Sequence, residues 1–243
     1  MKINWGVIKF ILILGLVVFV FSFSNQRNNA RNISEMTIEF EDEDRLFISQ
    51  KTVNKLLIQN IDSVTSIDKD TLVLNKMESI LLENPMIKNA EVYITIDGIL
   101  GVNVTQRKPV ARVKNEPDFY LDEDGEKMPL SAEYSARVPI VSGISEHQYA
   151  GISALIKEIE NDDFFKELIV GMDIVNENDV VFSVRKNRFK VLFGPPVEIE
   201  NKFQKFKAFY KILKRDSLLE NYSLINLKFK NQVVATKRET NGA

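Results

Sequence analysis

Few residues in this sequence could carry out chemistry. The chain has one histidine, His147, and no cysteine. A cysteine nucleophile, a cysteine-ligated zinc site and an iron–sulfur cluster are therefore excluded, and a Ser-His-Asp triad could use only His147. His147 lies in the polar stretch 145–148, which favours a surface position over a ligand position. A metal site would need this one imidazole together with carboxylates.

Two acidic runs and one glycine-proline segment are further candidates for ligand sites. Residues 41–44 lack the glycine and the distal glutamate of an EF-hand calcium loop, and residues 122–125 (D-E-D-G) are typical of a turn. Gly194-Pro195-Pro196 precedes a predicted helix, as anion-binding loops often do, but two prolines remove amide donors that a phosphate requires. We interpret all three segments as structural. Paired carboxylates for glycoside chemistry stay open, because their spacing is spatial.

The charge balance argues against a nucleic-acid partner. The chain has 32 basic and 34 acidic residues, a formal net charge of −2, whereas a nucleic-acid-binding protein is expected to show a basic surplus. The hydrophobic share of 44% and the charged share of 27% are ordinary for a folded protein. The sequence therefore predicts a folded binding protein that is not an enzyme and needs no cofactor, metal or small-molecule substrate.

The N-terminus contains an apolar run whose only charge is Lys9 and which follows Trp5. Its length suits a bilayer span of roughly 20 residues, so we predict a transmembrane signal anchor over residues 7–24, preceded by a short cytoplasmic segment, residues 1–6. A cleaved signal peptide and a buried core helix are the alternatives. The first lacks an Ala-x-Ala site, and the second would not be apolar on every face.

A tether and a first α+β domain are predicted over residues 25–113. Alternation of apolar and polar residues predicts strands, and an apolar stripe at helical spacing predicts helices. Asp97-Gly98 is a strong hairpin turn signal. The predicted order is β-α-α-β-β, with a strand at 36–40, a helix capped by Ser49, a helix at 75–83, and strands at 91–96 and 100–106.

A second, β-rich α+β domain with a short tail is predicted over residues 114–243. Its last predicted strands, 224–229 and 233–236, are joined at Lys230-Asn231. No later element could cover the final strand, so we expect it at a sheet edge with unpaired backbone N–H and C=O groups. Such an edge is a natural place for a strand of a partner protein to dock.

These patterns resemble a known family, the bacterial cell division proteins FtsQ/DivIB. Segments 72–75 (L-V-L-N), 84–87 (N-P-M-I) and 106–111 (Q-R-K-P-V-A) are similar to the POTRA domain of that family. The second domain of the family is resembled by Tyr120-Leu121-Asp122 with Gly125, Pro139-Ile140-Val141 with Gly143, Leu192-Phe193-Gly194 and Ile225-Asn226-Leu227. The version found in Bacteroidetes is resembled by Met128-Pro129-Leu130-Ser131 and Asn231-Gln232-Val233-Val234.

The resemblance implies a scaffold of the divisome that bridges early and late division proteins at the septum during the cell cycle. It implies a single-pass protein of the inner membrane with its bulk in the periplasm. The C-terminal domain is expected to bind membrane proteins of the FtsB/DivIC and FtsL type, and the POTRA domain other division proteins. The surface that binds partners in this family includes the last strand, which indicates Ile225, Asn226, Lys228, Lys230, Asn231, Gln232, Val233, Val234, Thr236 and Lys237 here.

Two other functions stay open at this point. The first is a POTRA-containing factor for outer-membrane protein assembly or secretion, although no alternating barrel strands follow the POTRA segment. The second is an anchored periplasmic cell-wall enzyme, which would need a pocket of carboxylates that the sequence does not reveal.

Overall fold

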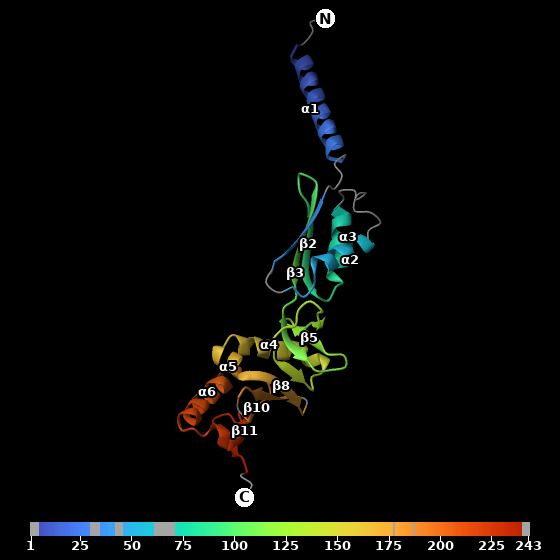
Figure 1. Cartoon of the computed structure of the whole chain (residues 1–243). Helices are drawn as coiled ribbons and strands as arrows, with labels where there is room; N and C mark the ends of the chain where they lie inside the picture. Colours follow the sequence, from blue (N-terminus) through green and yellow to red (C-terminus); the bar gives the residue numbers. More distant parts are fainter. Residues whose placement is uncertain are drawn as a thin grey trace. The chain divides into compact units, whose positions relative to one another are not determined.

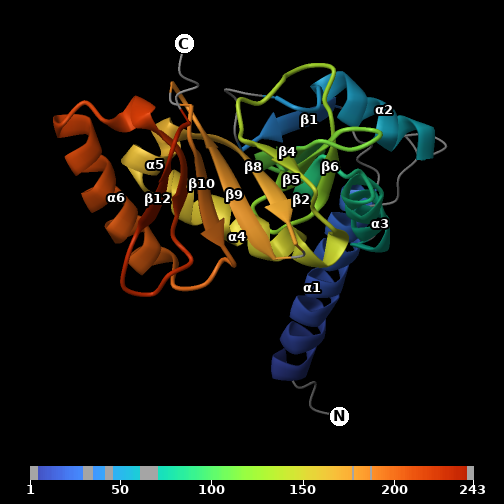
Figure 2. The same ribbon diagram turned by 90° about the horizontal axis from the view of Figure 1, so that it is seen from below.

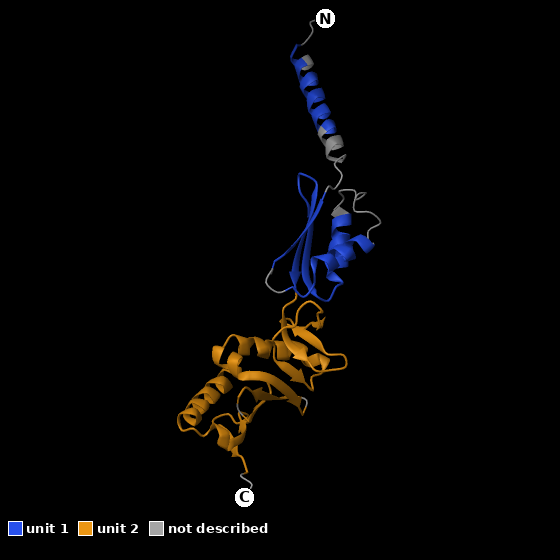
Figure 3. Ribbon diagram, in the orientation of Figure 1, with its two compact units in different colours: residues 1–106 blue, residues 107–243 orange. Residues whose placement is uncertain are grey.

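The chain folds into two compact units, residues 1–106 and 107–243 (Figure 3). The structure is a computed structural model and describes residues 5–29, 35–41, 46–60, 71–176, 178–186 and 188–239. The division between the units lies before the predicted domain boundary at residue 113. The reason is that strand β4 (Pro109–Val113) pairs with β5 (Phe119–Asp122) and β7 (Ile140–Ser142) of the second sheet.

The first element is α1 (Trp5–Asn29), a helix of 25 residues (Figure 1). Within the described part of the chain, no helix combines the length and the apolar composition that crossing a bilayer requires. The predicted transmembrane anchor over residues 7–24 and the predicted single-pass location in the inner membrane are therefore wrong. The prediction considered the apolar run alone, whereas the helix continues into the polar residues 25–29, which had been assigned to a tether.

The first unit has the β-α-α-β-β order that the sequence predicted. Its strands form a three-stranded sheet in the order β1-β3-β2, in which β1 is parallel and β2 antiparallel to β3. The two helices cover one face of this sheet (Figure 1). The elements are β1 (Glu35–Phe40), α2 (Gln50–Asn60), α3 (Thr71–Leu82), β2 (Ile87–Ile94) and β3 (Ile99–Gln106).

Local sequence explains these elements. Ser49 begins α2, because its Oγ accepts a hydrogen bond from the backbone N–H of Thr52 at 3.3 Å. Gly98 adopts a φ of 87° in the turn between β2 and β3, a conformation that residues with a side chain rarely adopt. The helices bury one stripe each against the sheet, and its fully buried members are Val53 and Leu57 on α2 and Met77 and Leu81 on α3.

The second unit is built on a nine-stranded sheet with the order β12-β11-β10-β9-β8-β7-β4-β5-β6. Helices α4, α5 and α6 cover one face of it (Figure 2). The remaining strands are β6 (Lys127–Pro129), β8 (Ile169–Val175), β9 (Asp179–Val184), β10 (Lys190–Gly194), β11 (Tyr222–Asn226) and β12 (Val234–Lys237). The helices are η2 (Glu146–Gln148), α4 (Tyr149–Glu160), α5 (Asp163–Leu168), α6 (Ile199–Arg215) and η3 (Leu219–Asn221).

An aromatic cluster joins α5 and α6 to the strands. The rings of Phe165 on α5 and Phe203 on α6 stack with centroids 3.9 Å apart, and Phe203 also contacts Phe193 of β10 at 5.9 Å. The apolar stripe of α6 faces this core, and Phe203, Phe206 and Leu213 are buried in it. Each such side chain contributes about 1.5–3 kcal/mol by its removal from water. This core fixes α6 against the strands that precede the chain's last hairpin.

The turn at residues 122–125 is structural, as the sequence indicated. The carboxylate of Asp122 has no exposed surface and pairs with Nη1 of Arg107 at 2.6 Å. Its other oxygen accepts hydrogen bonds from the backbone N–H groups of Asp124 at 3.0 Å and Glu126 at 2.7 Å. The carboxylate therefore orders the turn between β5 and β6 and is not available as a ligand.

The last hairpin differs from the prediction in its boundaries. Strand β11 ends at Asn226, before the predicted end at residue 229. The side-chain oxygen of Asn226 accepts the backbone N–H of Lys228 at 2.9 Å, and the N–H of Leu227 donates to the carbonyl of Leu192 at 2.9 Å. An asparagine that binds the backbone two residues on competes with strand pairing and favours a turn. Residues 227–233 therefore form a loop.

Candidate functional site

The candidate site is the edge formed by β12 and the loop before it. Among the described residues, strand β12 pairs antiparallel with β11 only and ends the nine-stranded sheet, so it is the edge strand that the sequence predicted. It buries none of its residues: Val234, Thr236 and Lys237 are exposed and Ala235 is half-buried. An exposed edge of this kind is a template for pairing with another chain.

The direction of the backbone groups of β12 follows from two contacts. The N–H of Arg238 donates to the carbonyl of Asn221 at 2.8 Å, and the carbonyl of Thr236 accepts from Oγ of Ser223 at 3.3 Å, so both residues point toward β11. Backbone groups alternate in direction along a strand. The N–H and C=O groups of Ala235 and Lys237 therefore point away from the sheet, into the space that an added strand would occupy.

The side chains of this edge divide between the two faces of the sheet. Val233 and Ala235 pack against the core of the second unit. Val234 is 39% exposed and lies with Thr236 on the opposite face. Ile225 on the neighbouring strand has no exposed surface, so its side chain supports the edge from inside. A partner strand would contact Val234 and Thr236 and leave Ile225 covered.

The loop before β12 is held by lysine side chains. Nζ of Lys205 on α6 donates to the carbonyls of Phe229 at 3.0 Å and Lys230 at 2.9 Å. Nζ of Lys228 pairs with the Asp179 carboxylate at 2.8 Å. The Phe229 side chain is 45% exposed. These contacts order the loop before β12, which contains the partly exposed Phe229.

The predicted partner-binding residues all fall in this one region, although they differ in accessibility. Sequence reasoning missed Ala235, because it considered side chains and not the direction of backbone groups. It also missed Lys205, whose contacts lie more than 20 residues along the chain and leave no local signal. The structure places Ile225 and Asn226 on β11, Lys228, Lys230, Asn231, Gln232 and Val233 in the loop, and Val234, Thr236 and Lys237 on β12.

The candidates for metal and anion sites that the sequence offered can be placed in the structure. The described residues include no group of three or more His, Asp or Glu side chains placed to hold a metal ion. His147 is exposed in η2. Nζ of Lys202, at the start of α6, donates to the carbonyl of Pro195 at 2.6 Å, and burial lowers the pKa of this lysine. Lys202 thus has a structural role in holding the Gly194-Pro195-Pro196 segment.

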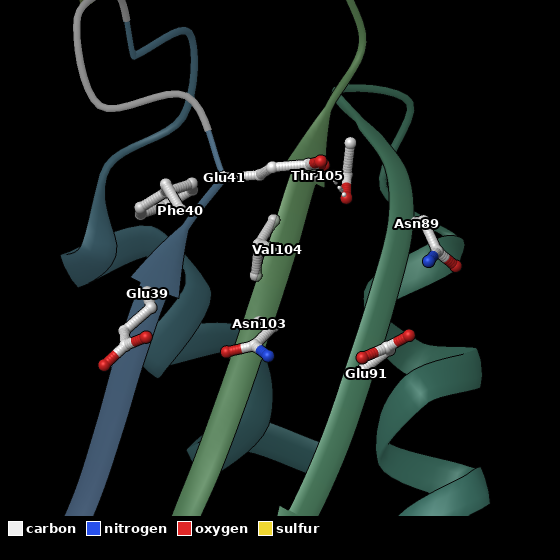
Figure 4. A pocket seen from close by; sticks show the side chains of 8 residues that line it. All are labelled: Glu39, Phe40, Glu41, Asn89, Glu91, Asn103, Val104 and Thr105. Carbon is white, nitrogen blue, oxygen red and sulfur yellow. Dashed lines mark hydrogen bonds between the residues drawn. The ribbon is translucent and has the colours of Figure 1, made fainter.

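A hollow lies on the face of the first sheet that the helices do not cover (Figure 4). Glu39, Asn103 and Glu91 face one another across the three strands in register. Glu41 adds a third carboxylate, whose Oε2 accepts from Oγ1 of Thr105 at 2.8 Å. This arrangement makes the sheet face acidic. Its lining contains no histidine, lysine, serine or tyrosine to act with the carboxylates.

Two protein families match the chain, and the boundary between their matches coincides with the boundary between the two units. A family described as FtsQ/DivIB, C-terminal related, matches residues 108–236, which is more than half of the 243 residues. A POTRA-like domain matches residues 32–105. No curated protein matches the chain.

Proposed function

Because the chain belongs to the FtsQ/DivIB, C-terminal related family, we propose that it is a scaffold of the bacterial divisome. It bridges division proteins by strand addition at β12. The domains of this family and POTRA domains are associated with division and with non-enzymatic scaffolding. The second unit binds division proteins of the FtsB/DivIC and FtsL type, and the POTRA-like unit binds other division proteins.

The observation that carries this proposal is the free edge of β12. Outward N–H and C=O groups at Ala235 and Lys237 provide backbone hydrogen bonds to an added strand, and these do not depend on the partner's sequence. Val234 and Thr236 then contact alternate side chains of that strand and provide selectivity. Phe229 extends the contact beyond the strand. The predicted partner-binding residues, apart from the buried Ile225, border this path.

The test is a single-residue change at the outward-facing amide. Ala235→Pro removes an N–H that points away from β11, so the β11–β12 ladder keeps its bonds while the added strand loses a donor. We expect roughly a two- to tenfold loss of affinity for a purified FtsB/DivIC-type partner, measured by calorimetry with the full chain. The matched control is Ala235→Ser, which keeps the N–H and a small side chain and should bind as the unaltered protein does.

Equal affinity of the proline and serine variants, with equal melting temperatures, would contradict docking at this edge. The cellular role has a separate test. Depletion of the protein should produce long cells without completed septa. Normal division accompanied by loss of outer-membrane proteins would instead assign the POTRA-like unit to outer-membrane assembly, and a purified chain that cleaved cell-wall polymer would indicate an enzyme.

A further inference from the structure

A hollow on the second unit carries an excess of positive charge. It lies where α5, the turn after β9 and the end of α6 come together. Its only acidic lining residue among those described is Glu167. The other lining residues are Lys166, Arg185, Lys186 and Lys214, which are basic, and Phe164, Leu168 and Tyr210, which provide apolar surface.

The walls of this hollow are fixed by contacts within the fold. The ring of Phe164 meets the ring of Tyr210 edge to face, with centroids 5.2 Å apart, which joins α5 to α6. The backbone N–H of Arg185 donates to the carbonyl of Leu168 at 2.7 Å, and its Nε donates to the carbonyl of Glu167 at 3.1 Å. These bonds hold the turn after β9 against the end of α5. The hollow is therefore formed before any ligand arrives.

Asp162 begins α5 and so positions Lys166 at the rim. Its Oδ1 accepts from the N–H groups of Phe164 at 3.1 Å and Phe165 at 3.4 Å, and its Oδ2 pairs with Nζ of Lys207 on α6. Asp162 and Lys207 do not line the hollow, and their charges neutralise each other.

Lys166, Lys186 and Lys214 are exposed, and none of them forms an ion pair with another described residue. Like charges gathered around one concave surface raise its potential and attract an anionic partner. The chain as a whole has a net charge of −2, so this positive region is local and does not reflect a generally basic protein.

We propose that this hollow is a second docking site, which binds an acidic segment of a partner protein. Carboxylates of the segment pair with Lys166, Lys186 and Lys214, and an apolar side chain between them packs against Phe164 and Tyr210. The apolar walls favour a peptide over a phosphate-rich polymer, which would leave them without a partner. This site goes beyond strand addition, because it binds through side chains of α5, the turn after β9 and α6 and not through the backbone of β12.

The test uses two labelled decapeptides and the full chain. One peptide carries Glu-Glu-Leu-Glu-Glu at its centre and the other Gln-Gln-Leu-Gln-Gln. We expect the glutamate peptide to bind at least about tenfold more tightly at low salt and to weaken as ionic strength rises, because exposed charge pairs are screened. The double variant Lys166→Glu/Lys214→Glu should abolish the preference, while Ala235→Pro should not change it.

The matched control is Lys157→Glu/Lys211→Glu, which makes the same change of charge on α4 and α6 outside the hollow and should retain binding. Lys166→Ala/Lys214→Ala, which removes charge without reversing it, should also reduce binding and covers the case in which the glutamate variant does not fold. Equal binding of the two peptides, or equal losses in the hollow and control variants, would overturn the proposal. Binding to anionic lipid vesicles that the peptide fails to displace would assign the hollow to a membrane surface and overturn it as well.

Discussion

The two edges of the nine-stranded sheet are built differently. At one edge, β6 buries Met128 completely and contains Pro129, which has no N–H to donate to another chain. At the other, β12 buries no side chain and carries the β-branched residues Val234 and Thr236 on its exposed face. The first edge is protected from further pairing, whereas the second keeps the features that favour it.

The connections that lead into the two edge strands also differ, in how firmly side chains hold them. The turn before β6 is ordered by the buried Asp122 carboxylate and its partner Arg107. The loop before β12 is ordered by Lys205, which is only half-buried and binds two backbone carbonyls. A buried ion pair resists opening more strongly than a partly solvated ammonium does. The edge that we propose to bind partners is therefore the one that can adjust.

The largest expected effect concerns the protected edge. Asp122→Ala leaves the Arg107 guanidinium without its partner and two backbone N–H groups without an acceptor, so we expect a loss of about 3–5 kcal/mol in the free energy of unfolding. Urea denaturation of the full chain measures it. Asp216→Ala, which breaks the exposed Arg215–Asp216 pair, serves as the comparison and should cost less than about 1 kcal/mol. Similar losses in the two variants would mean that the buried pair does not order this edge.

A smaller effect is expected at the open edge. Lys205→Met keeps the length of the side chain but removes both hydrogen bonds to the loop, so we expect a loss of about 1–2 kcal/mol in stability. The substitution should speed hydrogen exchange over residues 229–234 relative to the unaltered protein and leave exchange over residues 126–129 unchanged. This result would show that the change is local. Lys211→Met on the same helix, whose side chain is exposed, is the control. Unchanged exchange in the loop would mean that Lys205 does not hold it.

The smallest expected effect is a pH dependence of stability that comes from the contact between α5 and α6. Burial opposes ionisation of Asp162, but hydrogen bonds from Lys207 and from Phe165 outweigh it and hold the pKa of this carboxyl below its ordinary value. The ionised form is thus favoured in the folded state, and its stabilising effect is present above about pH 4 and is lost as the pH falls through the folded-state pKa. Acid titration of the melting temperature should therefore show a drop that Asp162→Asn reduces. An unaltered acid profile in that variant would contradict this linkage.

The first unit could be predicted in order and type because its signals are local. Ser49, Gly98 and the stripe of α2 act within one or two turns of the chain. The start of α3 at Thr71 precedes the predicted start at residue 75, and the side-chain pattern alone did not indicate it. The acidic run at residues 41–44, which we interpreted as structural, lies outside the described residues except for Glu41.

The second unit was less predictable because its contacts join distant segments. Strand β4 was assigned to the first domain, since nothing in its own sequence shows that it pairs with β7, more than 25 residues later. The hydrogen bonds of Lys205 to the loop and the direction of the Ala235 amide likewise depend on contacts that only the fold creates. The membrane anchor was predicted from composition over one window, and the helix that formed extends beyond that window.

The shortness of β12 limits how tightly any strand could be retained there. Only Ala235 and Lys237 present outward groups, so an added strand gains a few backbone hydrogen bonds of about 0.5–1.5 kcal/mol each. Their sum corresponds to a dissociation constant in roughly the millimolar range. Such a contact exchanges quickly, and durable assembly requires several contacts at once. A complex built in this way can be dismantled by weakening any one of them, which suits the division scaffold that we propose.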